Sequence, residues 1–360
     1  MSDAKRLILV GCGTVAELYH APALRQSERA GWLKVAALVD PSPERRATLR
    51  TLFPYAKEWA TMEDVREEPE LAIVASPVLF HAQQTAFLLE QGCTVLCEKP
   101  LCRTPEEACV IQEAAARSGR QVLTGFFRRF FPATEQIRNL ASAEGPLGRP
   151  LRFSAEVGGS FAWPAVSTTF FDRESAGGGV LMDIGSHNLD LLTWWFGEVT
   201  DAEYWDDAYG GVECNAFCRL RFAGGVEGTL RLSWDLPTTD ELVIEFERGC
   251  VRWATGRSNR LSVSWTGSPY ALAAELHKPA ERRPLGLGLP GRGYLAAFTE
   301  QLRNLLEVAE GLAEPRASLD DGVRNLRLIR RLYAARKVWC PSWFTPDEAQ
   351  AASRLAGGER

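Results

Sequence analysis

The sequence has no long apolar run and no block of like charge. Although 46% of its 360 residues are hydrophobic, no stretch approaches the ~20 apolar residues that cross a bilayer. The 41 basic and 46 acidic residues are scattered and give a net charge of −5. Nucleic acids and anionic membranes bind to clustered positive charge. The composition therefore argues against both of these partners.

The sequence also lacks a leader pattern and the cysteine spacing of a metal site. Residues 1–6 are polar and lead directly into a strand candidate, without the apolar segment of a secretory signal. The nine cysteines include no CxxC pair, and the group Cys93, Cys97, Cys102 and Cys109 has no His or second Cys pair to complete a tetrahedral shell. We therefore expect buried thiols, no metal, and a reducing, cytoplasmic location.

No internal repeat or low-complexity tract is present, and the length suits about two domains. In the first third, apolar strand candidates alternate with amphipathic helices, which is typical of a parallel sheet covered on both faces. We predict a doubly wound Rossmann domain over residues 1–124. The expected strands are 7–10, 33–39, 71–75, 94–97 and 121–124, and the expected helices are 14–29, one from 43, 80–90 and 105–118.

The pattern changes after residue 124. Runs between 202 and 263 alternate apolar and polar residues, which indicates an antiparallel sheet with one packed face. We predict an α+β domain over 125–360 with a large, mainly antiparallel open sheet. We expect a further strand at 151–157, helices at 132–143, 180–196, 294–312 and 320–336, and a loop or lid at 279–293.

The free face of this sheet is expected to make a homodimer or homotetramer. Its alternating apolar residues would be a costly patch to leave in water.

A GxGxxA run connects the first predicted strand to the first helix. Gly11 and Gly13 allow a tight turn and close approach to a pyrophosphate, and Thr14 and Val15 open the helix whose N-terminus meets its charge. Asp40 ends the second strand, where a carboxylate accepts hydrogen bonds from ribose hydroxyls and repels a 2′-phosphate. An ordinary Asp-Pro turn is the alternative. The motif predicts NAD in preference to NADP.

Glu98-Lys99-Pro100 follows the strand predicted at 94–97, at the edge where doubly wound sheets bind ligands. Pro100 favours an extended Lys99 and allows a cis bond. Lys99 could then reach a reacting oxygen; a solvated surface lysine is the alternative.

Asp183 and His187 follow three glycines at 177–179. In a helix from residue 180 they would lie at i and i+4 on one face, where the aspartate could orient the imidazole as a general base. The sequence has only four histidines, which gives this pair weight. A plain helix with a hydrogen-bonded histidine is the alternative.

The motifs, in this order, resemble the glucose–fructose oxidoreductase, inositol dehydrogenase and MocA (Gfo/Idh/MocA) family. The likeness covers nearly the whole chain, through GCGTVA at 11–16, SPVLFH at 76–81, CEKP at 97–100, GGGVLMDIGSHNLD at 177–190 and the two closing helices. It implies that Lys99, Asp183 and His187 form the catalytic group, and that the open sheet makes the oligomer. It also implies that one loop lies along the cofactor and that a second borders it, with Ser76, Pro77 and His81 in the first and Glu98 and Lys99 in the second.

Two positions depart from the family pattern. Many relatives carry Asn where Val78 stands, and Asn or another polar residue where Phe127 stands. Both changes remove hydrogen-bonding capacity near the cofactor or substrate. They weaken any transfer of substrate identity, but they leave the three catalytic residue types intact.

The substrate is less well specified. Trp163 could pack on the C–H face of a sugar, and Arg128 and Arg173 could contact hydroxyls, carboxylate or phosphate. Core packing is the alternative for the tryptophan, and structural or solvated roles are the alternatives for the arginines.

The predicted function is NAD-dependent interconversion of a secondary alcohol and a ketone on a sugar, cyclitol or sugar derivative. In the oxidation, His187 takes the hydroxyl proton, Asp183 holds the imidazolium, and Lys99 stabilises the alkoxide while a hydride leaves carbon. Three alternatives stay open. They are a redox-neutral, NAD-dependent glycoside hydrolase, a non-catalytic dinucleotide- or sugar-sensing regulator, and a reductase of a nucleotide-sugar or antibiotic-sugar pathway that runs the same chemistry backwards. The three intact residues count against the regulator.

Overall fold

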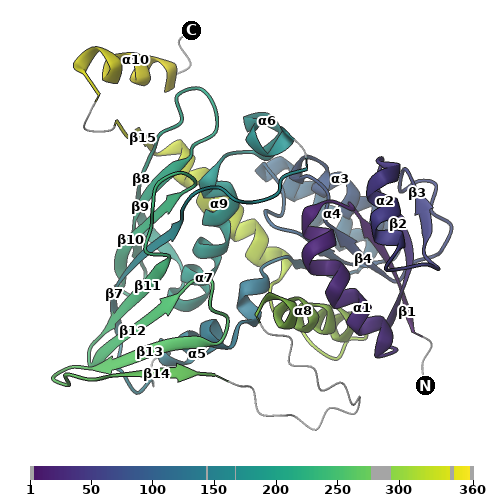
Figure 1. Cartoon of the computed structure of the whole chain (residues 1–360), viewed down its shortest axis with the longest axis horizontal. Helices are drawn as coiled ribbons and strands as arrows, with labels where there is room; N and C mark the ends of the chain where they lie inside the picture. The colour runs from purple at the N-terminus through teal and green to yellow at the C-terminus, as the bar shows by residue number, and fades with distance from the viewer. Residues whose placement is uncertain (1–3, 143–144, 167, 277–292, 341–343, 357–360) are drawn as a thin grey trace. The chain divides into compact units, whose positions relative to one another are not determined.

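The computed structural model describes residues 4–142, 145–166, 168–276, 293–340 and 344–356. These residues fall into two compact units (Figure 1). The first unit comprises 4–130, 164–166 and 293–326, and the second comprises 131–163, 168–276 and 327–356. The first unit is larger than the range 1–124, because two later segments pack with it. Except for Gly293, the loop or lid expected at 279–293 lies outside the described residues.

A six-stranded parallel sheet forms the centre of the first unit. Its strand order is β3-β2-β1-β4-β5-β6, and every neighbouring pair is parallel. This confirms the predicted doubly wound sheet. The short β3 carries no apolar run, so it could not be predicted from its residues. The strands are β1 Lys5–Val10, β2 Leu33–Val39, β3 Lys57–Trp59, β4 Leu71–Val74, β5 Thr94–Cys97 and β6 Val122–Thr124.

Helices cover both faces of this sheet. α1 and α8 contact each other, α3 and α4 contact each other, and α3 and α8 also contact β4 and β5 (Figure 1). Right-handed crossovers place α1 and the pair α3 and α4 on opposite faces. α8 was expected in the second domain, yet it packs beside α1 in the first unit. The helices are η1 Ala16–His20, a π-helix that continues into α1 Ala21–Arg29, then α2 Pro43–Arg50, α3 Val78–Glu90, α4 Pro105–Ser118, the 3-10 helix η2 Phe127–Phe130 and α8 Tyr294–Ala309.

Local sequence sets the ends of α4. The Thr104 hydroxyl accepts a hydrogen bond from the Glu107 N–H, and Pro105 occupies the first turn, where no N–H is needed. Gly119 ends the helix at φ 66°, a left-handed conformation that favours glycine. These signals explain why the predicted range 105–118 agrees with the structure.

A nine-stranded sheet forms the centre of the second unit. Its order is β14-β13-β12-β11-β7-β10-β9-β8-β15, and the pairs β7–β10 and β8–β15 are parallel while the other pairs are antiparallel. The predicted large, mainly antiparallel sheet is confirmed. Its strands are β7 Pro150–Gly158, β8 Val199–Asp206, β9 Asn215–Phe222, β10 Glu227–Ser233, β11 Glu241–Phe246, β12 Gly249–Ala254, β13 Arg260–Trp265, β14 Ala271–Glu275 and β15 Arg336–Val338.

One face of the sheet is covered by helices. Trp195 of α7 contacts Trp253 of β12, and Tyr333 of α9 contacts Tyr204 of β8. α5 packs against α7 and β13 (Figure 1). The remaining helices are η3 Thr168–Phe171, α5 Pro132–Leu140, α6 Arg173–Ala176, η4 Leu181–Gly185, α7 Ser186–Phe196, α9 Leu319–Ala334 and α10 Pro346–Ala356.

The outer face of the sheet is charged rather than apolar. The alternating apolar side chains, such as Leu230 and Ile244, are fully buried on the covered face. The residues between them form ion pairs across neighbouring strands: Arg219–Glu203, Arg221–Glu227, Arg231–Glu156, Arg252–Glu241 and Arg260–Glu275. The prediction that an apolar face of this sheet is exposed was therefore wrong. The apolar residues of the alternating pattern already pack in the core of the second unit.

Two further observations concern the described residues. None of the helices among them is both long and apolar enough to cross a membrane. The nine cysteines are free thiols, and burial raises the pKa of Cys12, Cys93 and Cys97 to about 12. These three thiols act as small packing groups, whereas Cys109 is exposed.

Candidate active site

The two glycines of the GxGxxA run have different roles in the first unit. Gly11 has φ +88°, donates its N–H to the Val39 carbonyl at 2.8 Å, and passes so close to the next loop that a Cβ would lie 2.4 Å from the Ser76 nitrogen. A Cβ on Gly13 would meet no atom nearer than 3.7 Å. The fold itself therefore requires Gly11, whereas the missing Cβ of Gly13 leaves the turn open. An open turn suits close approach of a pyrophosphate.

Asp40 is hydrogen-bonded to this turn. Its Oδ2 accepts the Cys12 N–H at 2.8 Å, and its Oδ1 accepts the Ser42 N–H at 2.9 Å. A carboxylate oxygen can accept more than one hydrogen bond, so both retain capacity for ribose hydroxyls. The guanidinium of Arg45, which follows Asp40 in the chain, is already paired with the Glu17 carboxylate at 3.3 Å. The residues present thus fit a dinucleotide.

Residues 164–166 lie beside the glycine turn. The Thr14 hydroxyl donates to the Pro164 carbonyl at 2.7 Å, and Val166 lies nearest to the position of a Gly13 Cβ. Thr14 is nearly buried and Val15 is half-buried. No local pattern of residues predicts this contact, because its partners are 150 residues apart.

Glu98, Lys99 and Pro100 form a turn, the Lys99 turn, at the carboxyl edge of β5. Its Lys99–Pro100 peptide bond is cis, as the sequence allowed. Lys99 is half-buried, and Glu98 is 5% exposed. His20 Nε2 donates to Glu98 Oε1 at 2.8 Å. Sequence reasoning missed His20; its only signal was the scarcity of histidine in the chain.

His81 connects the loop after β4 to the Lys99 turn. Its Nε2 lies 2.8 Å from the Ser76 carbonyl oxygen, and its Nδ1 lies 2.9 Å from that of Pro100. Both ring nitrogens thus face backbone groups, which leaves neither for a cofactor. Ser76 is half-buried and Pro77 is exposed, and their expected cofactor contacts stay predictions.

The predicted base pair lies in the second unit, on a helix that does not begin as a regular α-helix. Asp183 lies in the π-helical η4 and is half-buried, whereas His187 lies in the first turn of α7 and is 7% exposed. The i, i+4 spacing was argued for a continuous α-helix, and the π turn modifies that geometry. The helix after the GxGxxA turn also begins with a π turn. Single π turns are frequent at functional sites.

Glu213 fixes the start of this helix, and the sequence did not point to it. Its Oε1 accepts the N–H groups of Gly179 at 3.0 Å and Leu181 at 3.1 Å, and the Tyr333 hydroxyl at 2.7 Å. A Cβ on Gly179 would lie 2.1 Å from the Glu213 carbonyl oxygen. Burial raises the pKa of Glu213. Gly179 is therefore needed for close packing against the backbone of Glu213.

The substrate candidates are divided between the units. Arg128 is half-buried in the first unit; in the second, Trp163 is half-buried and Arg173 is exposed at the start of α6. Phe127 is 8% exposed and stacks on Phe298 with ring centroids 4.9 Å apart. This packing gives the unusual Phe127 a structural reason.

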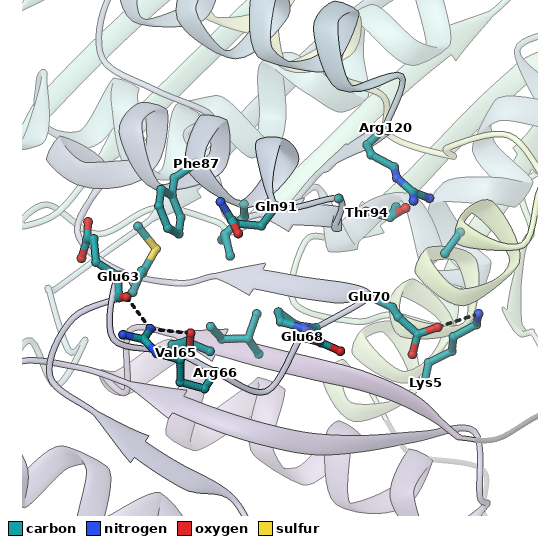
Figure 2. A pocket seen from close by; sticks show the side chains of 16 residues that line it. Lys5, Glu63, Val65, Arg66, Glu68, Glu70, Phe87, Gln91, Thr94 and Arg120 are labelled. Atoms are coloured by element: carbon teal, nitrogen blue, oxygen red, sulfur yellow. Dashed lines mark hydrogen bonds and ion pairs between the residues drawn. The ribbon is translucent and has the colours of Figure 1, made fainter.

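A cavity of about 780 Å³ lies at the opposite, amino edge of the parallel sheet (Figure 2). It is lined by ion-paired Lys5 and Glu70, 3.0 Å apart, and by Arg66, which donates to the Glu63 and Val65 carbonyls. None of the predicted site residues lines it. Among the described residues, no three His, Cys, Asp or Glu side chains are grouped as metal ligands.

Comparison with known families defines the class of protein. Residues 5–126 match the model of an oxidoreductase family with an NAD-binding Rossmann fold, and residues 135–252 match the GFO/IDH/MocA C-terminal domain. The chain belongs to the Gfo/Idh/MocA family. This confirms the resemblance seen in the sequence and the prediction that the protein is an oxidoreductase.

Individual relatives act on carbohydrates, as their names state. The chain is 30% identical over 327 residues to 1,5-anhydro-D-fructose reductase of Ensifer adhaerens, covering 88% of this chain and 92% of that protein. It is also 30% identical to D-glucoside 3-dehydrogenase of Escherichia coli K12, but only over 198 residues, which is 54% of this chain and 55% of that enzyme. A levoglucosan dehydrogenase solved with NADH and levoglucosan shares the fold, with a TM-score of 0.79, 20% identity, and coverage of 92% of this chain and 97% of that one.

Proposed function

We propose that the protein is an NAD-dependent dehydrogenase or reductase that interconverts a secondary alcohol and a ketone on a sugar, cyclitol or sugar derivative. The observation that carries this proposal is the Lys99 turn, held at the carboxyl edge of β5 in the unit that contains the open glycine turn. Doubly wound sheets bind their ligands at that edge. The named activities of the glucoside dehydrogenase and the anhydrofructose reductase, both on carbohydrates, support the substrate class.

Three side chains would carry the chemistry. In the oxidation, His187 takes the hydroxyl proton, Asp183 holds the resulting imidazolium, and the Lys99 ammonium stabilises the negative charge that develops on oxygen. The low exposure of His187 supports its part, because electrostatic stabilisation is larger where water is excluded. The substrate hydrogen on carbon leaves as a hydride, for which bound NAD is the acceptor.

The first unit would bind the dinucleotide, and the second would supply most of the substrate contacts. Gly11, Gly13, Thr14 and Val15 would receive the pyrophosphate, and Asp40 the adenosine ribose. Asp40 is negatively charged and hydrogen-bonded in place, which favours NAD over NADP. Trp163, Arg128 and Arg173 remain the proposed substrate contacts.

The proposal is tested by incubating the protein with NAD and a panel of cyclitols, aldoses, glycosides and nucleotide sugars. Reduced nicotinamide is followed by its absorbance, and a parallel assay with NADH and the corresponding ketones covers the reverse direction. A signal with one class of compound identifies the substrate family. Bound NAD with no turnover in either direction would contradict the proposal, and sugar release without net NAD reduction would indicate glycoside cleavage.

Lys99→Met should separate chemistry from cofactor binding. We expect turnover to fall about 100- to 1,000-fold, since one charge-stabilising donor is lost, while the Kd for NADH stays nearly unchanged. Lys57→Met on the edge strand β3 is the matched control and should behave like the wild type. Turnover that survives in Lys99→Met would remove the lysine from the mechanism.

A further inference from the structure

Two buried histidines flank the turn that carries Lys99. His20 is the last residue of η1 and is fully buried, and His81 lies in α3 with 2% of its surface exposed. Half of the four histidines in the chain therefore pack around this one turn.

His20 is hydrogen-bonded to the Glu98 carboxylate. The His20 ring lies edge-on to Phe298, with centroids 4.9 Å apart, and its Nδ1 has no hydrogen-bond partner among the described residues. The tautomer with its hydrogen on Nε2 meets Glu98 Oε1 and leaves no buried donor unsatisfied.

The other oxygen of Glu98 binds the turn itself. Glu98 Oε2 accepts the backbone N–H of Lys99 at 3.1 Å. On the opposite side, a Cβ on Gly125 would lie only 2.7 Å from that same oxygen, so the carboxylate fills the space beside this glycine. A chain of two hydrogen bonds thus runs from His20 through Glu98 to the backbone of Lys99.

His81 holds the other side of the turn, where it faces the carbonyls of Pro100 and Ser76. Burial lowers the pKa of His81, and the two carbonyls oppose this shift only in part. A neutral imidazole has one N–H, so its hydrogen bond goes to one of the two carbonyls at a time. The ring is therefore hydrogen-bonded to the Lys99 turn when its hydrogen is on Nδ1, and to the Ser76 carbonyl when its hydrogen is on Nε2.

We propose that His20 and His81 are positioning residues for Lys99, His20 through Glu98 and His81 through the Pro100 carbonyl. Neither would contact substrate or cofactor. They would hold the backbone from which the lysine ammonium reaches the reacting oxygen. The assigned role of Lys99 rests on the proposed function; the structural dependence of Lys99 on the two histidines does not.

Paired substitutions test each hydrogen bond. His20→Gln keeps an N–H near the position of Nε2, whereas His20→Leu removes it. We expect His20→Leu to lower kcat about 10- to 100-fold, as a displaced catalytic group does, with little change in the KM for NAD. His20→Gln should recover most of the loss. Ser27→Ala, in the helix that continues from His20, is the control for destabilisation alone, because Ser27 is buried and its hydroxyl donates to the Ala23 carbonyl of the same helix.

His81 offers a second matched pair. An asparagine amide can replace Nδ1 and reach the Pro100 carbonyl, whereas a glutamine amide replaces Nε2 and reaches the Ser76 carbonyl. The proposal expects His81→Asn to retain more turnover than His81→Gln. The reverse order would overturn the part assigned to His81, even if His81→Leu fails to fold.

A readout independent of activity completes the test. The chain has six lysines, so reductive ¹³C-dimethylation, which keeps their charge, gives few NMR resonances, and Lys99→Arg identifies that of Lys99. His20→Leu should shift or broaden this resonance selectively, and His20→Gln should restore it. A Lys99 resonance that is unchanged in both leucine variants would overturn the inference. An inactive wild type would contradict the proposed function and leave this measurement valid.

Discussion

Asp40 is the residue on which the choice between NAD and NADP is expected to depend. The carboxylate accepts a hydrogen bond from the backbone of the glycine turn. We propose that it also places a negative charge where a 2′-phosphate would lie. The neighbouring Arg46 donates to the Asp40 carbonyl and faces Glu58 at 3.8 Å, so its charge is partly compensated within the unit.

Asp40→Asn should relax this preference. The amide keeps one oxygen acceptor for the turn but removes the charge. The ratio of NADPH to NADH affinity should therefore rise about 10- to 100-fold, because the carboxylate no longer repels the 2′-phosphate. Titration of nicotinamide fluorescence with both cofactors measures the ratio. Equal affinities of the wild type for NADH and NADPH would contradict the preference itself.

At the scale of elements, a buried ion pair joins η2 to α9 within the first unit. Arg129 Nη1 lies 2.9 Å from Asp321 Oδ2, and the side chains are 4% and 14% exposed. The Ser318 N–H and hydroxyl donate to the same carboxylate. Burial raises the pKa of Asp321, but Arg129 and Ser318 together bring it below its ordinary value.

Asp321→Asn should therefore destabilise the protein in a pH-dependent way. The folded-state pKa lies below the unfolded value of about 3.9, so the pair contributes fully above that pH and its contribution is lost as the pH falls through the folded value. Near pH 7 we expect a loss of about 3 kcal/mol in unfolding free energy, because a buried Arg129 loses its partner.

Denaturant unfolding at several pH values measures this difference, which should shrink below about pH 4. Arg324→Ala is the matched control, since Arg324 lies 3.5 Å from the same carboxylate and its own side chain is 58% exposed. Its effect should stay under about 1 kcal/mol, as for other surface pairs. A loss in Asp321→Asn that is independent of pH would contradict the electrostatic explanation.

At the scale of the whole molecule, the outer face of the nine-stranded sheet changes the expectation for assembly. We still predict a homodimer or homotetramer through this sheet, but the attraction would come from complementary ion pairs rather than apolar burial. On the same face, the ring centroids of Trp205 and Phe217 lie 5.6 Å apart, and the Lys337 ammonium lies over the indole of Trp205.

Light scattering at increasing salt tests this expectation. The mass should be that of a dimer or tetramer near 50 mM salt and should fall toward the monomer near 1 M, where the Debye length is about 3 Å. Glu203→Lys, which breaks the pairing with Arg219 and Lys337, should weaken assembly without lowering NADH affinity. A monomer at low salt would exclude association through this face.

The sequence by itself determined most of the elements and the motifs. The strands at 7–10, 33–39 and 94–97 and the helix at 105–118 were predicted because their signals are local: apolar runs, helix caps, and glycines that end an element. The order of the GxGxxA, EKP and GGG motifs was enough to predict the family, because each motif occupies a fixed place at the end of a strand or the start of a helix.

Only the tertiary structure decided which distant residues meet. The place of α8 beside α1, the His20–Glu98 hydrogen bond, and the contact of Glu213 with Gly179 join segments that are far apart in the chain. The covering of the apolar face of the second sheet was decided in the same way. Period two predicts one apolar and one polar face, but it does not say whether helices of the same chain or a second subunit cover the apolar one. Such contacts depend on how the elements pack, and no local pattern of residues encodes them.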